Sequence, residues 1–323
     1  MENMLQHENT DDPHQQQKLN PWEKMAQEVM ANEPSHEVVE KKFYETNVEF
    51  SGDDFINFRN ELFNATPDEA KRIIESRITL LEESADKVKK ISGAAMAQHI
   101  HRGYISGDTA VSFGDTIGSQ YKLKDTEYLY DAVNYLRNNK ERISNGRQFF
   151  EQLTGFLNSY FGIPDTSKDR WATIENKTGL QSIQDDNEYW NAIDNIDIGV
   201  FKGEHVAQCS ERSAMAQNIM SLFGYETYYV NGDVSVDGKK NEGHAYNIVA
   251  DNGGQKLLVD YSITSAIEHN GTSWDIPTMA IIEDYDSFVA GNNIKTSSWR
   301  HTIQNDGNVT HKRGRALVYG IMK

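Results

Sequence analysis

The sequence predicts an α+β fold in which a helical N-terminal half precedes an antiparallel sheet. Up to Gly224, apolar side chains recur at helical spacing, whereas after it they gather in short runs rich in β-branched and aromatic residues. Clusters of Gly, Asn and Asp, which favour turns, separate these runs. A series of helices followed by a series of strands is typical of α+β proteins.

Length and charge set the outer limits of this prediction. The chain has 323 residues, 37% of them hydrophobic, which is enough for two domains with sizeable cores. We predict a disordered polar tail over 1–38, a helical domain over 39–145 and a second domain over 146–323. The formal net charge of −17 repels phosphate groups, so neither nucleic acid nor a membrane is expected as a partner.

The N-terminal region and the hydropathy predict a cytoplasmic protein by default. The first residues lack the basic and apolar regions of a cleavable signal peptide. No run approaches the roughly 18 apolar residues that a membrane span requires. Export by a route that needs no cleaved signal peptide stays open, and the sequence predicts no oligomeric state.

The clearest helix signal lies over 67–92. Thr66 suits an N-cap, Pro67 suits the first helical position, and Gly93 follows the last periodic residue. Further helices are predicted over 125–139, 146–163 and 186–195, with a loop over 163–179.

Beyond Gly224 the pattern predicts strands joined by short connections. The strands cover 225–234, 244–251, 256–263, 278–284 and 315–322, and one short helix covers 284–291. Successive strands of this kind are expected to pair as an antiparallel meander.

Cys209 is the only cysteine, so no intrachain disulfide can form. It stands at the start of a predicted amphipathic helix that Gly224 ends as the C′ residue. The unpaired amides and the dipole at a helix N-terminus favour the thiolate, which is the reactive form of cysteine. Glu211 in the first turn would oppose this effect. Because a lone cysteine is more often buried and inert, a nucleophile requires a base beside it.

A base and an orienting group follow Cys209 on two predicted strands. His244 starts the first strand and Asp260 lies on the second, with the turn sequence ADNGG between them. A three-residue loop over 251–253 would set His244 directly opposite Asp260, with both side chains on one face of the sheet. A two-residue loop would place them on opposite faces.

Residues 203–263 resemble the transglutaminase-like superfamily, whose members are cysteine enzymes with a papain-like fold. The shared features are a cysteine at a helix start, a glycine after the helix, a strand ending in glycine, a His-Ala-aromatic strand and an apolar strand ending in Asp. The matching residues are Cys209, Gly224, Gly232, His244, Ala245, Tyr246 and Asp260. The resemblance implies a papain-like core in which the Cys-bearing helix packs on an antiparallel sheet. The chain departs from many members by having Tyr246 in place of Trp and by lacking Pro-Thr after the Asp.

The resemblance also implies a Cys-His-Asp triad for acyl transfer from an amide of a protein or peptide. Cys209 would be the nucleophile, His244 the base and then the acid, and Asp260 the group that orients His244. The outcome would be proteolysis, amide hydrolysis or deamidation, or cross-linking, and bacterial members favour hydrolysis. The alternatives left open are a non-catalytic interaction module of papain-like fold and an enzyme similar to arylamine N-acetyltransferases. No cofactor is expected.

Support for an oxyanion is harder to assign from the sequence. Gln208 precedes the nucleophile, but Trp171 and Trp190 are also upstream, and the backbone N–H of Cys209 is the firmest expectation. The region 39–145 carries no recognisable chemistry and is expected to pack beside the helix of Cys209.

Three further histidines, His99, His101 and His205, carry other expectations. His99 and His101 are spaced as strand-borne metal ligands can be, but no third ligand accompanies them, so no metal site is expected. His205 is expected to start a turn.

Overall fold

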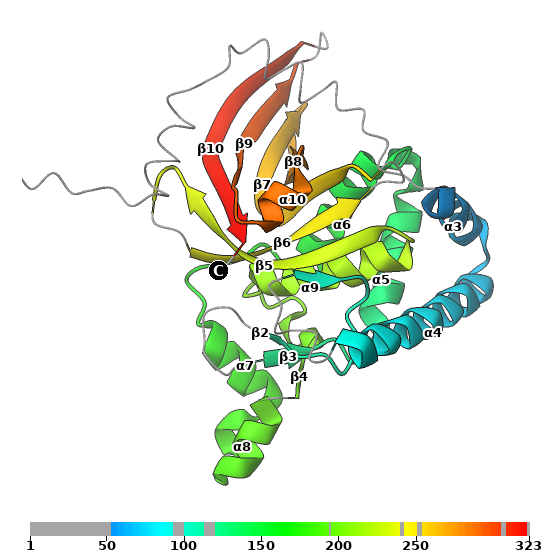
Figure 1. Cartoon of the computed structure of the whole chain (residues 1–323), viewed down its shortest axis with the longest axis vertical. Coiled ribbons are helices and arrows are strands. Elements are labelled where there is room, and N and C mark those ends of the chain that lie inside the picture. The colour runs from blue at the N-terminus through cyan, green and yellow to red at the C-terminus, as the bar shows by residue number, and fades with distance from the viewer. Residues whose placement is uncertain are drawn as a thin grey trace, which may run out of the picture.

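The computed structural model describes residues 53–92, 100–112, 120–193, 195–239, 242–250, 254–304 and 308–321 (Figure 1). The predicted tail over 1–38 and Gly93 lie outside these ranges. The helices are α3 (Asp53–Asn64), α4 (Pro67–Ser92), α5 (Glu127–Asn138), α6 (Gly146–Phe161), α7 (Arg170–Thr178), α8 (Asp186–Ile193), α9 (Cys209–Leu222) and α10 (Tyr285–Val289). The strands are β1 (Ile100–Arg102), β2 (Val111–Ser112), β3 (Gln120–Lys122), β4 (Ile196–Asp197), β5 (Glu226–Val236), β6 (Glu242–Ala250), β7 (Lys256–His269), β8 (Thr272–Ile282), β9 (Ile294–Ile303) and β10 (Val309–Ile321).

Strands β5, β6, β7, β9 and β10 form a closed five-stranded barrel (Figure 1). β5 pairs antiparallel with both β6 and β10, so the sheet closes on itself. β9 pairs antiparallel with β10 and parallel with β7, and β8 adds to β7 outside the ring. β1 extends the edge of β5, while β2, β3 and β4 form a separate small sheet.

The predicted fold class is wrong. Helices and strands are mixed along the chain, and a closed barrel replaces the papain-like core and open meander that the sequence suggested. Strands β1 to β4 contain too few residues to show an alternating pattern, and β9 carries a pattern that is not strongly apolar. Closure of the barrel depends on the pairing of β5 with β10. These segments are distant in the chain, and no local sequence pattern predicts that they pair.

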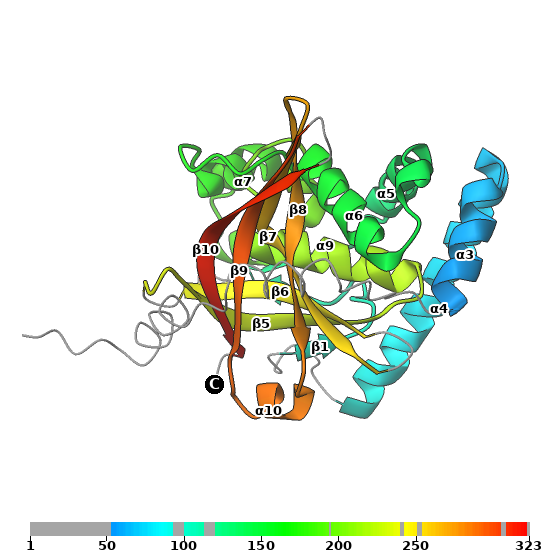
Figure 2. The same ribbon diagram turned by 90° about the horizontal axis from the view of Figure 1, so that it is seen from above.

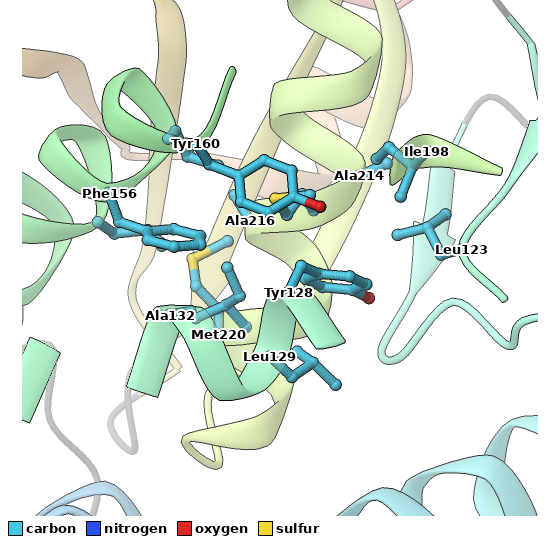
Figure 3. Close-up of a cluster of buried hydrophobic side chains, with 14 of the residues drawn as sticks. Leu123, Tyr128, Leu129, Ala132, Phe156, Tyr160, Ile198, Ala214, Ala216 and Met220 are labelled. Atoms are coloured by element: carbon cyan, nitrogen blue, oxygen red, sulfur yellow. The ribbon is translucent and has the colours of Figure 1, made fainter. Parts of the chain in front are cut away.

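Helix α9 lies against the outer face of the barrel, packed on β5, β6 and β7 (Figure 2). Helices α4, α5 and α6 contact its other sides, so the prediction that the upstream helices pack beside it is confirmed. Figure 3 shows part of this core, with Ala216 and Met220 of α9 among Tyr128, Leu129 and Ala132 of α5 and Phe156 and Tyr160 of α6. One buried hydrophobic cluster therefore continues across residue 145, and the division at that point stays a prediction.

The predicted amphipathic character of α9 is wrong, because every residue from Ser210 to Leu222 is buried. Its polar side chains are accommodated by specific hydrogen bonds. Arg212 donates to Asn158 Oδ1 at 2.7 Å, and the Asn218 side chain exchanges two bonds with the backbone of Ile105, at 2.7 and 2.9 Å. A buried polar group that is fully hydrogen-bonded costs little, so a central helix can carry polar residues.

Local signals account for several helix ends. Thr66 and Glu69 form the capping box that begins α4, with the Thr66 N–H 2.9 Å from Glu69 Oε2. The predicted loop over 163–179 is wrong, since α7 lies within it. Asp169 caps α7 through the Ala172 N–H, and Gly179 ends it in the left-handed conformation.

No helix within the described ranges is long and apolar enough to cross a bilayer.

Candidate active site

Cys209 is the first residue of α9, and its side chain is partly buried. The Glu211 carboxylate accepts the Gln208 N–H at 2.8 Å and the Ser210 hydroxyl at 2.9 Å, and it forms an ion pair with Arg170. Residue 211 was expected to oppose a thiolate at this position. The guanidinium of Arg170 offsets that negative charge, so the helix N-terminus can still favour an anion.

His244 lies on β6 between Cys209 and Asp260. Its Nε2 atom is 2.7 Å from Oδ2 of Asp260, and the Cys209 side chain lies close enough to the ring to help raise the pKa of His244. Since Nε2 faces the carboxylate, Nδ1 is the nitrogen left for the thiol. The structure therefore brings the three predicted residues together, and the predicted contact between His244 and Asp260 is confirmed.

The strand register behind this contact differs from the predicted one. Ala250 pairs with Lys256, so β6 and β7 are joined by 251–255 rather than by a three-residue loop. His244 consequently does not stand directly opposite Asp260, and that part of the prediction is wrong by two positions. A shift of two keeps both side chains on one face, which is why they still meet.

A break in the β7–β8 ladder shapes the surroundings of Asp260. Asp260 pairs with Thr278, but the next pair joins Thr264 to Pro277, so three residues of β7 bulge from the ladder. Two of them turn their backbone N–H groups towards Oδ1 of Asp260: Ser262 at 2.8 Å and Ile263 at 3.1 Å. The bulge thus supplies donors that a regular strand would use in pairing.

Asp260 and His244 share the strand face that lines the barrel interior. Alternation along β6 puts His244 on the side of Tyr246, and alternation along β7 puts Asp260 on the side of Leu258, both members of the apolar interior cluster. The His244 and Asp260 side chains are 9% and 0% exposed. A carboxylate in such a place is tolerated only with several hydrogen bonds. A fourth donor is the Tyr319 hydroxyl of β10, 2.7 Å from Oδ2.

Charge pairing decides how these buried groups ionise. Burial disfavours the charged imidazole, but the Asp260 carboxylate and its hydrogen bond outweigh burial and raise the pKa of His244 to about 10. Burial likewise opposes ionisation of Asp260. The charge of His244 and the donated hydrogen bonds nevertheless hold the pKa of Asp260 below its usual value. At neutral pH the site therefore contains an imidazolium paired with a carboxylate.

Gly232 explains why the barrel can close beside this pair. It pairs with His244 on one side and with Ile321 on the other. A Cβ at this position would lie 2.2 Å from the carbonyl oxygen of Gly320 and 2.8 Å from the Tyr246 ring. The Tyr246 hydroxyl donates to that same oxygen at 2.8 Å, so only glycine leaves room for the contact.

The remaining predicted residues do not join the triad. Gln208 is the exposed N-cap of α9, and its oxyanion role stays a prediction. Trp171 donates its indole N–H to Glu175 of its own helix, and Trp190 is 57% exposed on α8.

His205 and His101 each contact a backbone carbonyl oxygen. His205 has a left-handed backbone with φ of 63° in the expected turn, and its ring contacts the Ile163 carbonyl. His101 is buried on β1, and His99 lies outside the described residues. Within the described part of the chain, no group of three or more His, Cys, Asp or Glu side chains is placed to hold a metal ion.

Two contributors were missed from the sequence. Arg170 falls in the segment expected to be a loop, although the capping residues around α7 could have placed it on a helix. Tyr319 is 59 residues from Asp260, and the pairing of strands in the barrel brings it near.

Comparisons with protein-family models, with curated proteins and with solved structures find no match for this chain.

Proposed function

We propose that the protein is a cysteine-dependent enzyme that transfers an acyl group from an amide of a protein or peptide, with water as the usual acceptor. The observation that carries the proposal is the His244–Asp260 contact of 2.7 Å beside a cysteine that begins a buried helix. A nucleophile, a base and an orienting group in hydrogen-bonding order are what such catalysis requires. The resemblance of residues 203–263 to the transglutaminase-like superfamily supports the same chemistry. This support comes from the sequence motif alone, because the fold is not the papain-like one that the resemblance implied.

Cys209 forms and breaks the covalent bonds of the proposed reaction, and His244 transfers the protons. The Cys209 thiolate attacks the carbonyl carbon, forming an S–C bond and a tetrahedral oxyanion. When the oxyanion collapses, the C–N bond breaks and the His244 imidazolium gives its proton to the leaving amine. Water then attacks the thioester, His244 accepts a proton from it, and the acid and the thiolate are released with His244 protonated again.

Asp260 acts through His244 and does not exchange a proton. By accepting the Nε2–H, it fixes the ring so that Nδ1 faces the sulfur, and it stabilises the charged imidazole. The backbone N–H of Cys209 lies in the first turn of α9, where amides have no helical partner. It is therefore the donor proposed for the oxyanion.

The proposal is tested first on the thiol. Full-length protein is treated with iodoacetamide at neutral pH, and labelling of Cys209 is followed by mass spectrometry in the wild type and in His244→Ala. We expect fast labelling of the wild type and a rate lower by about tenfold or more in the variant, because the imidazolium no longer stabilises the thiolate. The control is His205→Asn, which changes an exposed histidine four positions before the cysteine to a residue that tolerates a positive φ.

The reaction itself is tested by comparing proteomes incubated with the wild type or with Cys209→Ala. New N-termini would identify proteolysis, glutamine converted to glutamate would identify deamidation, and isopeptides would identify cross-linking. Products dependent on Cys209 are expected, with hydrolysis dominant. Slow labelling that is indifferent to His244, together with no product that depends on Cys209, would overturn the proposal. Acetylation of arylamines dependent on acetyl-CoA would replace it with the transferase alternative.

A further inference from the structure

Tyr319 shares one carboxylate oxygen of Asp260 with the histidine. Its hydroxyl is 2.7 Å from Oδ2, the same carboxylate oxygen that lies 2.7 Å from His244 Nε2. The tyrosine side chain is fully buried on β10. A phenol O–H can donate only one hydrogen bond, and here it is directed at a carboxylate.

The two oxygens of Asp260 are held by different parts of the fold. Oδ1 accepts backbone N–H groups from the bulge in β7, whereas Oδ2 accepts side-chain donors from β6 and β10. The bulge therefore anchors the carboxylate through Oδ1, and two side-chain donors, Tyr319 and His244, share Oδ2. Hydrogen bonds to a charged acceptor are about twice as strong as neutral ones, so losing one is felt by the other.

Building on the proposed function, we propose that Tyr319 is a positioning residue of the triad. Its hydroxyl keeps Asp260 ionised in the apolar barrel interior and holds Oδ2 in line with His244 Nε2. The imidazole orientation thus depends on a strand that contributes no residue to the Cys-His-Asp sequence pattern.

The neighbouring Tyr246 provides a matched control. Both tyrosines are buried in the barrel interior, and their rings meet edge to face with centroids 5.2 Å apart. The Tyr246 hydroxyl, however, donates to the backbone oxygen of Gly320 and not to the carboxylate. Tyr319→Phe and Tyr246→Phe each remove one buried hydroxyl and one hydrogen bond, but only the first changes the donors of Asp260.

The experiment observes the His244 Nε2–H proton by NMR in full-length, substrate-free protein. We expect this resonance to shift or broaden in Tyr319→Phe and to stay in place in Tyr246→Phe. Iodoacetamide labelling of Cys209 at neutral pH should slow by roughly three- to tenfold in Tyr319→Phe, because one charge-assisted bond that orients the triad is lost.

A resonance that stays at the wild-type position in Tyr319→Phe, or that moves equally in both variants, would overturn the positioning role. Should Tyr319→Phe fail to fold, 3-fluorotyrosine incorporated at position 319 replaces it, since it keeps the shape and gives a more acidic hydroxyl. The same resonance must then move, and an unmoved resonance overturns the proposal. The resonance is read without substrate, so it reports on Tyr319 even if Cys209 proves not to form an acyl-enzyme.

Discussion

Two histidines on the barrel strands, each paired with another side chain, ionise in opposite ways. On β6 and β7, His244 meets a carboxylate and its pKa is raised to about 10. On β9 and β10, His301 meets His311, with their Nδ1 atoms 2.7 Å apart, and the pKa of His301 is lowered to about 4. Burial disfavours the charged ring in both places, and the charge of His311 and of Arg147 adds to that at His301. The partner, not the degree of burial, decides whether a buried histidine carries a proton at neutral pH.

Replacing the Asp260 carboxylate should make the ionisation of His244 resemble that of His301. In Asp260→Asn, the largest influence that opposes burial is lost, so the pKa of His244 should fall well below its value of about 10. We expect turnover of a substrate identified in the proteome comparison to fall by about 10³–10⁴-fold, as when the carboxylate of a serine triad becomes an amide. NMR titration of the imidazole tests the ionisation, and turnover tests the consequence. Wild-type turnover in this variant would contradict the role of the charge.

A side chain at Gly232 should disturb the packing around His244 and leave the His301–His311 pair unchanged. In Gly232→Ala, the new Cβ would meet a backbone oxygen at 2.2 Å, and β5, β10 or the Tyr246 ring must shift. Overpacking of this kind costs about 1–3 kcal/mol, measurable by urea denaturation. The control is Gly107→Ala, where the nearest atom lies at 3.3 Å and a smaller loss is expected.

The two histidines should give stability opposite dependences on pH. Between about pH 4 and 6.5 the unfolded chain binds a proton at His301 that the folded protein excludes, so stability should rise with pH. Between 6.5 and about 10 the folded protein keeps a proton on His244 that the unfolded chain has released, so stability should fall as pH rises. Each effect is at most about 1.4 kcal/mol per pH unit, the value for one proton.

Urea denaturation across this pH range measures both slopes. His301→Gln should flatten only the acidic side, and His244→Gln only the basic side. Slopes that neither substitution changes would show that other groups control the pH dependence.

The smallest expected effect is on the reactivity of the Cys209 thiol when the His301–His311 pair is disrupted. His301 and His311 lie on β9 and β10 and contact each other, whereas Cys209 begins α9. His301→Gln should therefore leave the rate of iodoacetamide labelling within roughly twofold of the wild type, as for independent sites. A larger change would mean that the two histidine pairs are coupled through the barrel.

The sequence predicted the candidate site better than the fold that holds it. Cys209 at a helix start and His244 and Asp260 on adjacent strands follow from local patterns, which are set by helix ends and strand periodicity. The register was wrong by two positions because the loop between β6 and β7 extends to residue 255. Because the register error is an even number of positions, the predicted faces of the side chains were nevertheless correct.

The features that could not be predicted depend on contacts between distant segments. Tyr319 lies 59 residues after Asp260 in the chain, and nothing in the sequence around it predicts their contact. The polar residues of α9 indicated a solvent-facing side, but partners such as Asn158 and Ile105, far away in the chain, allow them to be buried. Arg170 could have been placed on a helix from Asp169 and Gly179, so that omission reflects an overlooked local signal.

The pairing of β5 with β10 also bears on the order in which the molecule assembles. Ile321 pairs with Gly232, and the β-hairpins between them must form or be held aside before the ring can close. Contacts of such long sequence separation form slowly, because the entropy of loop closure is lost before they stabilise the chain. During synthesis β10 also emerges after the other barrel strands, so Cys209 is made well before Tyr319. We expect the thiol to become reactive late in refolding, together with ring closure, and not when α9 first becomes helical.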